Sequence, residues 1–214
     1  MKIKGVVVGP FQSNTWIVTD AAGATGVVVD PGDEPQRILD AIEGEGVTVA
    51  AILLTHGHID HVGAAAEIAE ATGAKVHLHP GDLEVLEMVP SQCRLFGVRV
   101  VQAPVINEAL EDETELRFGA LSVRCIHTPG HSPGHTCFLF TEGEERLLTS
   151  GDLLFAGSIG RTDLWGGNAS DMRTSLERIQ ELAPQIAVYS GHGPTTTIGK
   201  ETRNNPYLNG LLAF

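Results

Sequence analysis

The 214-residue chain is long enough for one large domain or two small ones, and its composition, 42% hydrophobic and 19% charged, is that of a globular protein. It carries 14 basic against 27 acidic residues, a formal net charge of −13 that is spread along the chain. This acidic balance argues against a nucleic-acid or an anionic-membrane partner, because both bind basic surfaces.

The cysteines and the apolar runs bear on the location of the protein. Cys93, Cys125 and Cys137 form no C-x-x-C pair, which is typical of reduced thiols in a cytoplasmic protein. The first residues, MKIKGVVVGPFQSN, lack the long apolar segment of a signal peptide. No apolar stretch approaches the ~18 residues that a membrane span needs. We therefore expect a cytoplasmic protein without a membrane segment.

The first half of the chain predicts strands that alternate with helices. Strands are predicted at 2–8, 15–19, 26–30, 49–54 and 75–79. Helices are predicted within 30–46, at 62–72 and at 82–89. In the first helix Asp33 is the expected N-cap, Pro35 lies in the first turn, and Gly44 or Gly46 ends the helix. Gly73 is the expected end of the second helix.

The second half begins with a segment, 91–113, that has no clear periodicity and is expected to be mostly loop. Strands are then predicted at 121–127, 136–140, 146–150 and 186–190, and a helix at 170–182. Groups of strands with helices between them predict a single α/β domain built in layers. The pattern alone does not determine the order of the layers.

Potential metal ligands crowd into the loop after the strand at 49–54. The stretch THGHIDH places His56, His58, Asp60 and His61 within six positions, and Gly57 relaxes the backbone between the first two. Imidazole and carboxylate side chains together suit zinc, iron or manganese.

Three further strands run into loops that carry the same kinds of side chain. The strand at 121–127 leads into HTPGHSPGH, with His127, His131 and His135. The strand at 146–150 is followed by Asp152, and the strand at 186–190 by His192. Ligands that follow several strands can meet at one edge of a sheet, so we expect a single site there.

The motifs THGHIDH, PGH, GD and GHG, in this order, resemble the metallo-β-lactamase superfamily over nearly the whole chain. The stretches TPGHSPGHT, SGDLLFAGSIGRTDL and GHGPTTTIGKETRNNPYL resemble more narrowly the short bacterial glyoxalase II-like hydrolases. The resemblance implies an αββα sandwich whose site lies at one edge of its two sheets.

The resemblance also implies a centre of two divalent metal ions. One metal would be held by His56, His58 and His131, the other by Asp60, His61 and His192, and Asp152 would bridge them. Zinc is the expected metal, with iron or manganese as alternatives.

Such a centre would hydrolyse a thioester, with S-lactoylglutathione or a related small molecule as substrate. The hypothesis is that a hydroxide shared by the two metals attacks the carbonyl carbon while Asp60 orients it. Two features depart from the larger glyoxalase II enzymes. The chain ends at residue 214, too soon after His192 for their C-terminal helical extension, and Arg161 and Asp163 stand where they have a glutathione-contacting Lys and Tyr.

Other functions remain open within the same fold. The GRTD stretch at 160–163 also resembles mononuclear iron persulfide dioxygenases, although those usually have GHTPGC where this chain has GHSPGH. Lactonases share the ligand set. Asp152 disfavours β-lactamases, which have Cys or Ser there, and the acidic charge disfavours RNA-processing relatives. A purely structural metal module is disfavoured because seven ligands for two metals leave open positions.

Several other residues favour structural roles. His135 is expected to support the ligands from outside their set. We expect His127, His77 and His79 to bind no metal. Cys125 and Cys137 are expected to be small core residues. Arg161 is either an ordinary surface charge or a contact for an anionic substrate, and the oligomeric state is left open.

Overall fold

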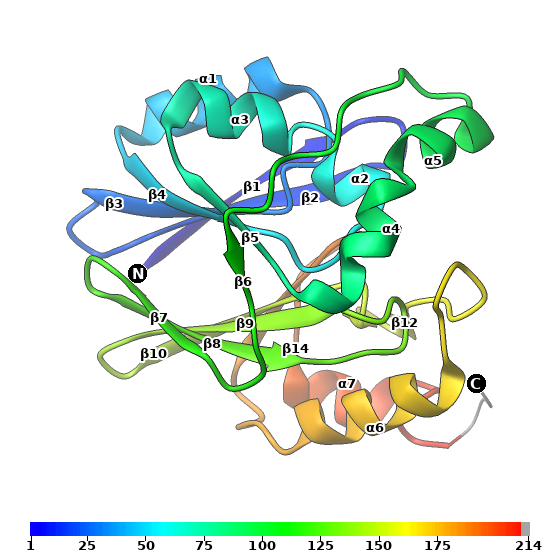
Figure 1. The fold of residues 1–214 in the computed structure, drawn as a ribbon. Coiled ribbons are helices and arrows are strands. Elements are labelled where there is room, and N and C mark those ends of the chain that lie inside the picture. Colours follow the sequence, from blue (N-terminus) through cyan, green and yellow to red (C-terminus); the bar gives the residue numbers. More distant parts are fainter. Residues whose placement is uncertain (211–214) are drawn as a thin grey trace.

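Two six-stranded sheets lie face to face in the computed structural model, which describes residues 1–210, and helices cover both outer faces (Figure 1). Helices α1 and α3 lie on the first sheet, and α6 and α7 lie on the second. This arrangement is the αββα sandwich that the resemblance implied, so the predicted fold class is confirmed.

The first sheet is built from the N-terminal half, in the order β1-β2-β3-β4-β5-β6. Its strands are β1 (Lys2–Val8), β2 (Ser13–Thr19), β3 (Thr25–Val29), β4 (Thr48–Leu53), β5 (Lys75–Leu78) and β6 (Glu108–Ala109). The first three strands are antiparallel, and β3 to β6 run parallel, with α1 (Pro35–Glu45) and α3 (Ala65–Thr72) as crossovers.

The second sheet has the order β14-β13-β10-β9-β8-β7. Its strands are β7 (Glu115–Phe118), β8 (Leu121–His127), β9 (Thr136–Glu142), β10 (Glu145–Gly151), β13 (Ala187–Ser190) and β14 (Thr196–Thr197). A small hairpin, β11 (Leu154–Phe155) and β12 (Ser158–Ile159), follows β10. Helix α6 (Ala169–Gln180) connects β12 to β13, and α7 (Ile198–Asn204) follows β14.

The core has three apolar layers because the strands of the sandwich are buried on both faces. In β3 and β4, Val28 and Ile52 pack toward the helices, whereas Val27 and Leu53 pack between the sheets. Phe138 of β9 is fully buried in that middle layer. Met172 of α6 belongs to the third layer, under the second sheet. Each such side chain contributes roughly 1.5–3 kcal/mol by burial, so the layers hold the strand ends in place.

Helix boundaries correct two of the expectations. Asp33 is not the N-cap of α1: Glu34 occupies that position with φ of 49°, and no side chain caps the helix. The Asp33 carboxylate instead accepts a hydrogen bond from the Glu34 N–H at 2.7 Å. Pro35 in the first turn, Gly46 at the end of α1 and Gly73 at the end of α3 are as predicted.

The helix predicted at 62–72 corresponds to α3, which begins at Ala65, three residues later than predicted. A separate short helix, α2 (Ile59–Val62), precedes it and was not predicted. The loop after β3 crosses at the break: a Cβ on Gly63 would lie 2.3 Å from the Gly32 carbonyl oxygen, and the Ala64 N–H donates to the Pro31 carbonyl. This tertiary contact separates α2, which carries Asp60 and His61, from α3.

The segment 91–113 is only partly the predicted loop. Helix α4 (Leu83–Glu87), preceded by the short 3₁₀ helix η1 (Pro80–Asp82), is followed by α5 (Val89–Phe96), and β6 pairs with β5. The short elements β7, β11, β12, β14 and α7 were also not predicted, because two to seven residues carry too little periodicity. None of the helices in residues 1–210 has the length and apolarity that crossing a bilayer requires.

Candidate metal centre

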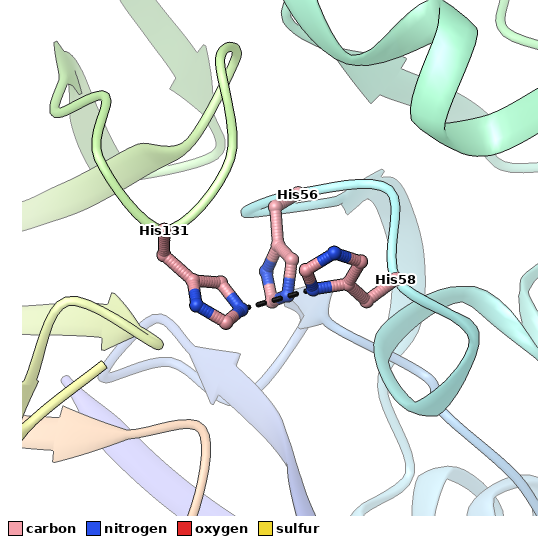
Figure 2. Close-up of side chains that lie close together, drawn as sticks. All are labelled: His56, His58 and His131. Carbon is pink, nitrogen blue, oxygen red and sulfur yellow. Dashed lines mark hydrogen bonds between the residues drawn. The ribbon is translucent and has the colours of Figure 1, made fainter. Parts of the chain in front are cut away.

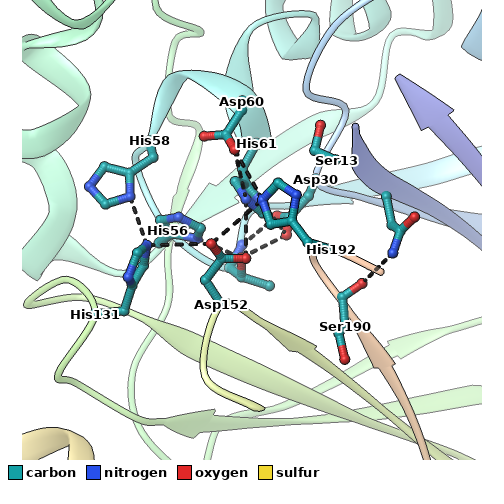
Figure 3. A network of polar contacts seen from close by, with 12 residues as sticks. Ser13, Asp30, His56, His58, Asp60, His61, His131, Asp152, Ser190 and His192 are labelled. Atoms are coloured by element: carbon teal, nitrogen blue, oxygen red, sulfur yellow. Dashed lines mark hydrogen bonds and ion pairs between the residues drawn. The ribbon is translucent and has the colours of Figure 1, made fainter. Parts of the chain in front are cut away.

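All seven predicted ligands lie close together at one edge of the two sheets (Figure 3). They come from four loops: the β4–α2 loop and α2 supply the first cluster, the β8–β9 loop supplies His131, and Asp152 and His192 follow β10 and β13. The sequence pattern of ligands after strand ends therefore corresponds to one place in the fold.

His56, His58 and His131 form one group of ring nitrogens (Figure 2). One potential ligand atom from each lies within 4.8 Å of the others, and Nδ1 of His58 is 2.9 Å from Nε2 of His131. All three side chains are buried.

Asp60, His61 and His192 form a second group with the same spacing limit. The Asp60 Oδ2 atom lies 3.1 Å from Nε2 of His192 and 3.6 Å from Nε2 of His61. Asp60 and His192 are partly exposed, so this group faces the opening of the site.

Asp152 lies between the two groups (Figure 3). Its Oδ1 is 3.3 Å from Nε2 of His61, and its Oδ2 is 3.6 Å from both Nε2 of His131 and Nε2 of His192. One carboxylate thus contacts members of both groups.

The donor atoms fit a cation. Among the described residues, Nε2 of His56, His58 and His61 and Oδ1 of Asp152 are buried without a hydrogen-bond partner. An unsatisfied buried polar atom costs about 1–3 kcal/mol, so such a cluster is costly unless another group binds it. Imidazole nitrogens and carboxylate oxygens that converge without donors between them suit divalent metals.

Burial and charge set the protonation of this cluster. Burial, reinforced by the neighbouring imidazoles, lowers the pKa of His56 far below its ordinary value and that of His58 to about 3. Burial alone would raise the pKa of the Asp152 carboxyl, but His61 and the other imidazoles outweigh it and hold that pKa well below its usual range. Neutral imidazoles and an ionised carboxylate are the forms in which these side chains bind metals. Burial opposes the effect, but the carboxylates of Asp152 and Asp60 raise the pKa of both His61 and His192, so a metal would displace a proton from these two rings.

Asp30 is a supporting residue that the sequence analysis missed. Its Oδ1 accepts from the Thr55 N–H at 2.7 Å, and its Oδ2 accepts from the Thr55 hydroxyl at 2.7 Å and lies 3.0 Å from Nδ1 of His61. This contact directs Nε2 of His61 into the site. The signal was present, since Asp30 ends a predicted strand as the ligands do.

Asp82, also missed, joins two of the ligand loops. Its fully buried carboxylate accepts from the Gly57 N–H at 2.7 Å, the Ser132 hydroxyl at 2.7 Å and the Gly134 N–H at 2.5 Å. Burial raises the pKa of this carboxyl, and the hydrogen bonds oppose the rise. It connects the loop of His56 and His58 to the loop of His131.

The remaining histidines lie outside both groups. The ring of His135 is fully buried, with Nδ1 2.9 Å from the Thr128 hydroxyl, and its Nε2 accepts from the Asp152 N–H at 3.1 Å. His127 stacks on His79 at 4.0 Å, with its Nε2 2.9 Å from the Pro133 carbonyl, and His77 lies edge-on to Phe118. As expected, His135 supports the site from outside, and Cys125 and Cys137 are buried core residues.

A cleft of about 210 Å³ opens above the ligands. Besides ligands from both groups, it is lined by Phe11, Ile59, Gln92, Phe96, Arg161, Leu164 and Trp165. A small substrate can therefore reach the second group and Asp152 directly.

Comparison with known proteins identifies the class. Residues 8–192 match the metallo-beta-lactamase superfamily, and the chain belongs to this superfamily of metal-dependent hydrolases. A probable metallo-hydrolase of Bacillus subtilis, YqgX, is 38% identical over 99% of each chain. Hydroxyacylglutathione hydrolase GloC of Haemophilus influenzae is 35% identical, covering 98% of this chain and 99% of its own.

Solved structures give the same family. The B3 metallo-beta-lactamase BLEG-1 superimposes with a TM-score of 0.89 at 36% identity, covering 98% of this chain and all of its own. TTHA1623, in a di-iron-bound form, has a TM-score of 0.86 at 42% identity, covering 96% and 100%. ETHE1 from Myxococcus xanthus has a TM-score of 0.80 at 26% identity, covering 98% and 85%.

Proposed function

We propose that the protein is a binuclear metal-dependent thioester hydrolase that acts on S-lactoylglutathione or a related acyl thioester. The observation that carries this proposal is the pair of ligand groups with the Asp152 carboxylate between them. The similarity to hydroxyacylglutathione hydrolase GloC supports the thioester assignment.

The proposed ligands are those that the sequence indicated. His56, His58 and His131 would hold one metal, and Asp60, His61 and His192 would hold the other. Asp152, which lies within 3.6 Å of His61 and His131, would be a ligand shared by the two groups. When bound, such ions make water nucleophilic near neutral pH and polarise the carbonyl of the substrate. Zinc is the first candidate. Iron and manganese suit the same donors, and the di-iron form of TTHA1623 supports iron.

The side chains of the site would organise the hydrolysis. Asp60 lines the cleft, where its carboxylate would orient the attacking water and accept its proton. The water oxygen bonds to the carbonyl carbon, the C–S bond breaks, and the thiol leaves with a proton. The products are one carboxylic acid and one thiol.

The test is a metal count combined with a thioesterase assay. The protein is purified without added metal, its metals are counted by elemental analysis, and the same sample is assayed on S-lactoylglutathione and other acyl thioesters. Two metals per chain with turnover of a thioester are expected. Two metals without turnover of any thioester would refute the proposed reaction.

A mononuclear iron persulfide dioxygenase is the second candidate. The similarity to ETHE1 and the GRTD stretch at 160–163 fit this alternative. It would show one iron per chain and oxygen uptake with glutathione persulfide. Lactone and β-lactam substrates in the same assay series test the ester hydrolase and β-lactamase activities of the fold, the latter because of the similarity to BLEG-1.

We further propose a small-molecule substrate, no nucleic-acid partner, and a cytoplasmic location. The net charge of −13 supports the absence of a nucleic-acid partner. The three cysteines, all buried and unpaired, support a reducing compartment.

A further inference from the structure

The cleft above the candidate ligands has an aromatic wall. Phe11, in the β1–β2 turn, and Phe96, at the end of α5, pack edge to face with ring centroids 5.4 Å apart. Leu164 and Trp165 also line the cleft. Phe96 remains 41% exposed, so apolar surface is left open beside the reacting centre. An apolar surface of this kind in a cleft favours an apolar group on the ligand.

Gln92 also lines the cleft, but its side-chain amide already makes hydrogen bonds within the protein. Its Oε1 accepts from the Ile59 N–H at 2.8 Å, and its Nε2 donates to the Val85 carbonyl at 2.8 Å. The Gln92 side chain is fully buried. It holds α5 against α2 and has no amide group free to recognise a substrate.

Arg161, the cationic side chain in the lining of the cleft, forms an ion pair with Asp163. Its Nε donates to Oδ1 of Asp163 at 2.6 Å and its Nη2 to Oδ2 at 2.8 Å. The bond from Arg161 lowers the pKa of Asp163 to about 2, so the pair is ionised at neutral pH and its two charges offset each other. A substrate carboxylate would have to compete with Asp163 for the Nε and Nη2 donors of this guanidinium.

The hollow next to the cleft has more acidic than basic residues in its lining. It shares Phe11, Ile59 and Asp60 with the cleft, and its basic residue is Arg99. The lining also includes Asp33 and Glu67, and Nη2 of the largely exposed Arg99 lies 4.0 Å from Oε1 of Glu67. Acidic side chains therefore outnumber basic ones at this entrance.

We infer that the substrate is a thioester that carries an apolar, uncharged group beside the reacting carbonyl, and that Phe11, Phe96, Leu164 and Trp165 bind this group. Within the proposed thioester class, glutathione thioesters, which have two carboxylates, are then poorer substrates than neutral thioesters with an apolar acyl group. The inference rests on the proposed thioester hydrolysis and specifies its substrate class.

The test compares three thioesters on the enzyme with its metals bound. The phenylacetyl and lactoyl thioesters of N-acetylcysteamine differ only in the acyl group. S-lactoylglutathione has the same lactoyl group but carries charged glutathione in place of neutral N-acetylcysteamine. We expect kcat/KM for the phenylacetyl thioester to exceed that for the lactoyl thioester by at least about tenfold, the order of discrimination that an apolar pocket provides. S-lactoylglutathione should be the poorest of the three.

Two test variants, each with a matched control variant, locate the cause of the preference. Phe96→Ser should lower the phenylacetyl-to-lactoyl ratio of kcat/KM severalfold. Leu95→Ser is its matched control, because Leu95 is 64% exposed on the same helix and does not line the cleft, and it should leave the ratio unchanged. Asp163→Asn releases Arg161 and should raise kcat/KM for S-lactoylglutathione relative to the neutral lactoyl thioester. Glu108→Gln, which removes the same charge from the ion pair with Lys75, should not.

The outcomes separate this inference from the proposed function. A preference for S-lactoylglutathione over both neutral thioesters would overturn the inference and leave the thioesterase standing. A phenylacetyl preference that Phe96→Ser and Leu95→Ser alter equally would also overturn it. Absence of turnover with all three thioesters would refute both proposals.

Discussion

At the residue scale, the Asp82 carboxylate connects two ligand loops but touches no ligand side chain. Its substitution tests whether the position of these loops depends on it. Asp82→Asn would turn one of its acceptors into a donor facing Gly57, Ser132 or Gly134. We expect the metal affinity of the His56, His58 and His131 group to fall about 10–100-fold, as for other supporting contacts of metal ligands. A chelator-competition titration measures the two affinities separately.

The second group serves as the internal reference for this experiment, because Asp30 rather than Asp82 holds His61. Its affinity should change much less. Asp40→Asn, an exposed change in α1, is the surface control. An equal loss at both groups would show that Asp82 serves general stability and not the position of one ligand loop.

Asp152 contacts both groups, so its removal should affect the whole centre. Asp152→Ala deletes the carboxylate that lies 3.3 Å from His61 and 3.6 Å from both His131 and His192. We expect fewer than two metals per chain and a loss of turnover greater than about a hundredfold, since even supporting contacts cost about 10–100-fold. Elemental analysis and thioester kinetics measure the two effects. Full metal content with full turnover would contradict the bridging role.

At the scale of elements, the break between α2 and α3 positions Asp60 and His61. Gly63→Ala would place a Cβ 2.3 Å from the Gly32 carbonyl oxygen and 2.9 Å from the Ile59 carbonyl oxygen. The backbone would have to move, so we expect the free energy of unfolding to fall by about 1–3 kcal/mol. Urea denaturation measures this change. Gly44→Ala in α1 is the matched control: its nearest neighbour is Nζ of Lys4 at 4.0 Å, and it should gain about 0.5–1 kcal/mol. Similar effects of both substitutions on the free energy of unfolding would show that the contact between Gly63 and the Gly32 carbonyl is not important for stability.

At the scale of the whole molecule, the candidate centre joins the two sheets. His56 follows β4 of the first sheet, whereas His131, Asp152 and His192 follow strands of the second (Figures 1 and 3). A metal that binds only the folded chain at a hundred times its Kd adds about 2.7 kcal/mol of stability, which for a chain of this size is about 5–11 °C in Tm.

Metal removal should therefore lower the melting temperature by about this amount in a calorimetric scan with and without chelator. Excess zinc should restore it. His131→Ala, which removes a ligand from one group, should show a smaller response to the chelator. If the protein contains two metals but its Tm does not change with chelator, the metals do not stabilise the contact between the two sheets.

The sequence by itself predicted the long strands and a cluster of candidate ligands after strand ends, because long periodic segments and a dense His/Asp motif carry local signals. The αββα sandwich and the division of the seven candidate ligands between two metals came from the family resemblance of the motifs. The sequence did not predict the short helix α2 or the short strands β11, β12 and β14, since these depend on contacts with distant chain segments. The tertiary structure alone placed Asp82 between two ligand loops and paired Arg161 with Asp163 at the cleft. A residue's hydrogen-bond partners and net charge environment are set by the packing of the fold, and sequence spacing does not record them.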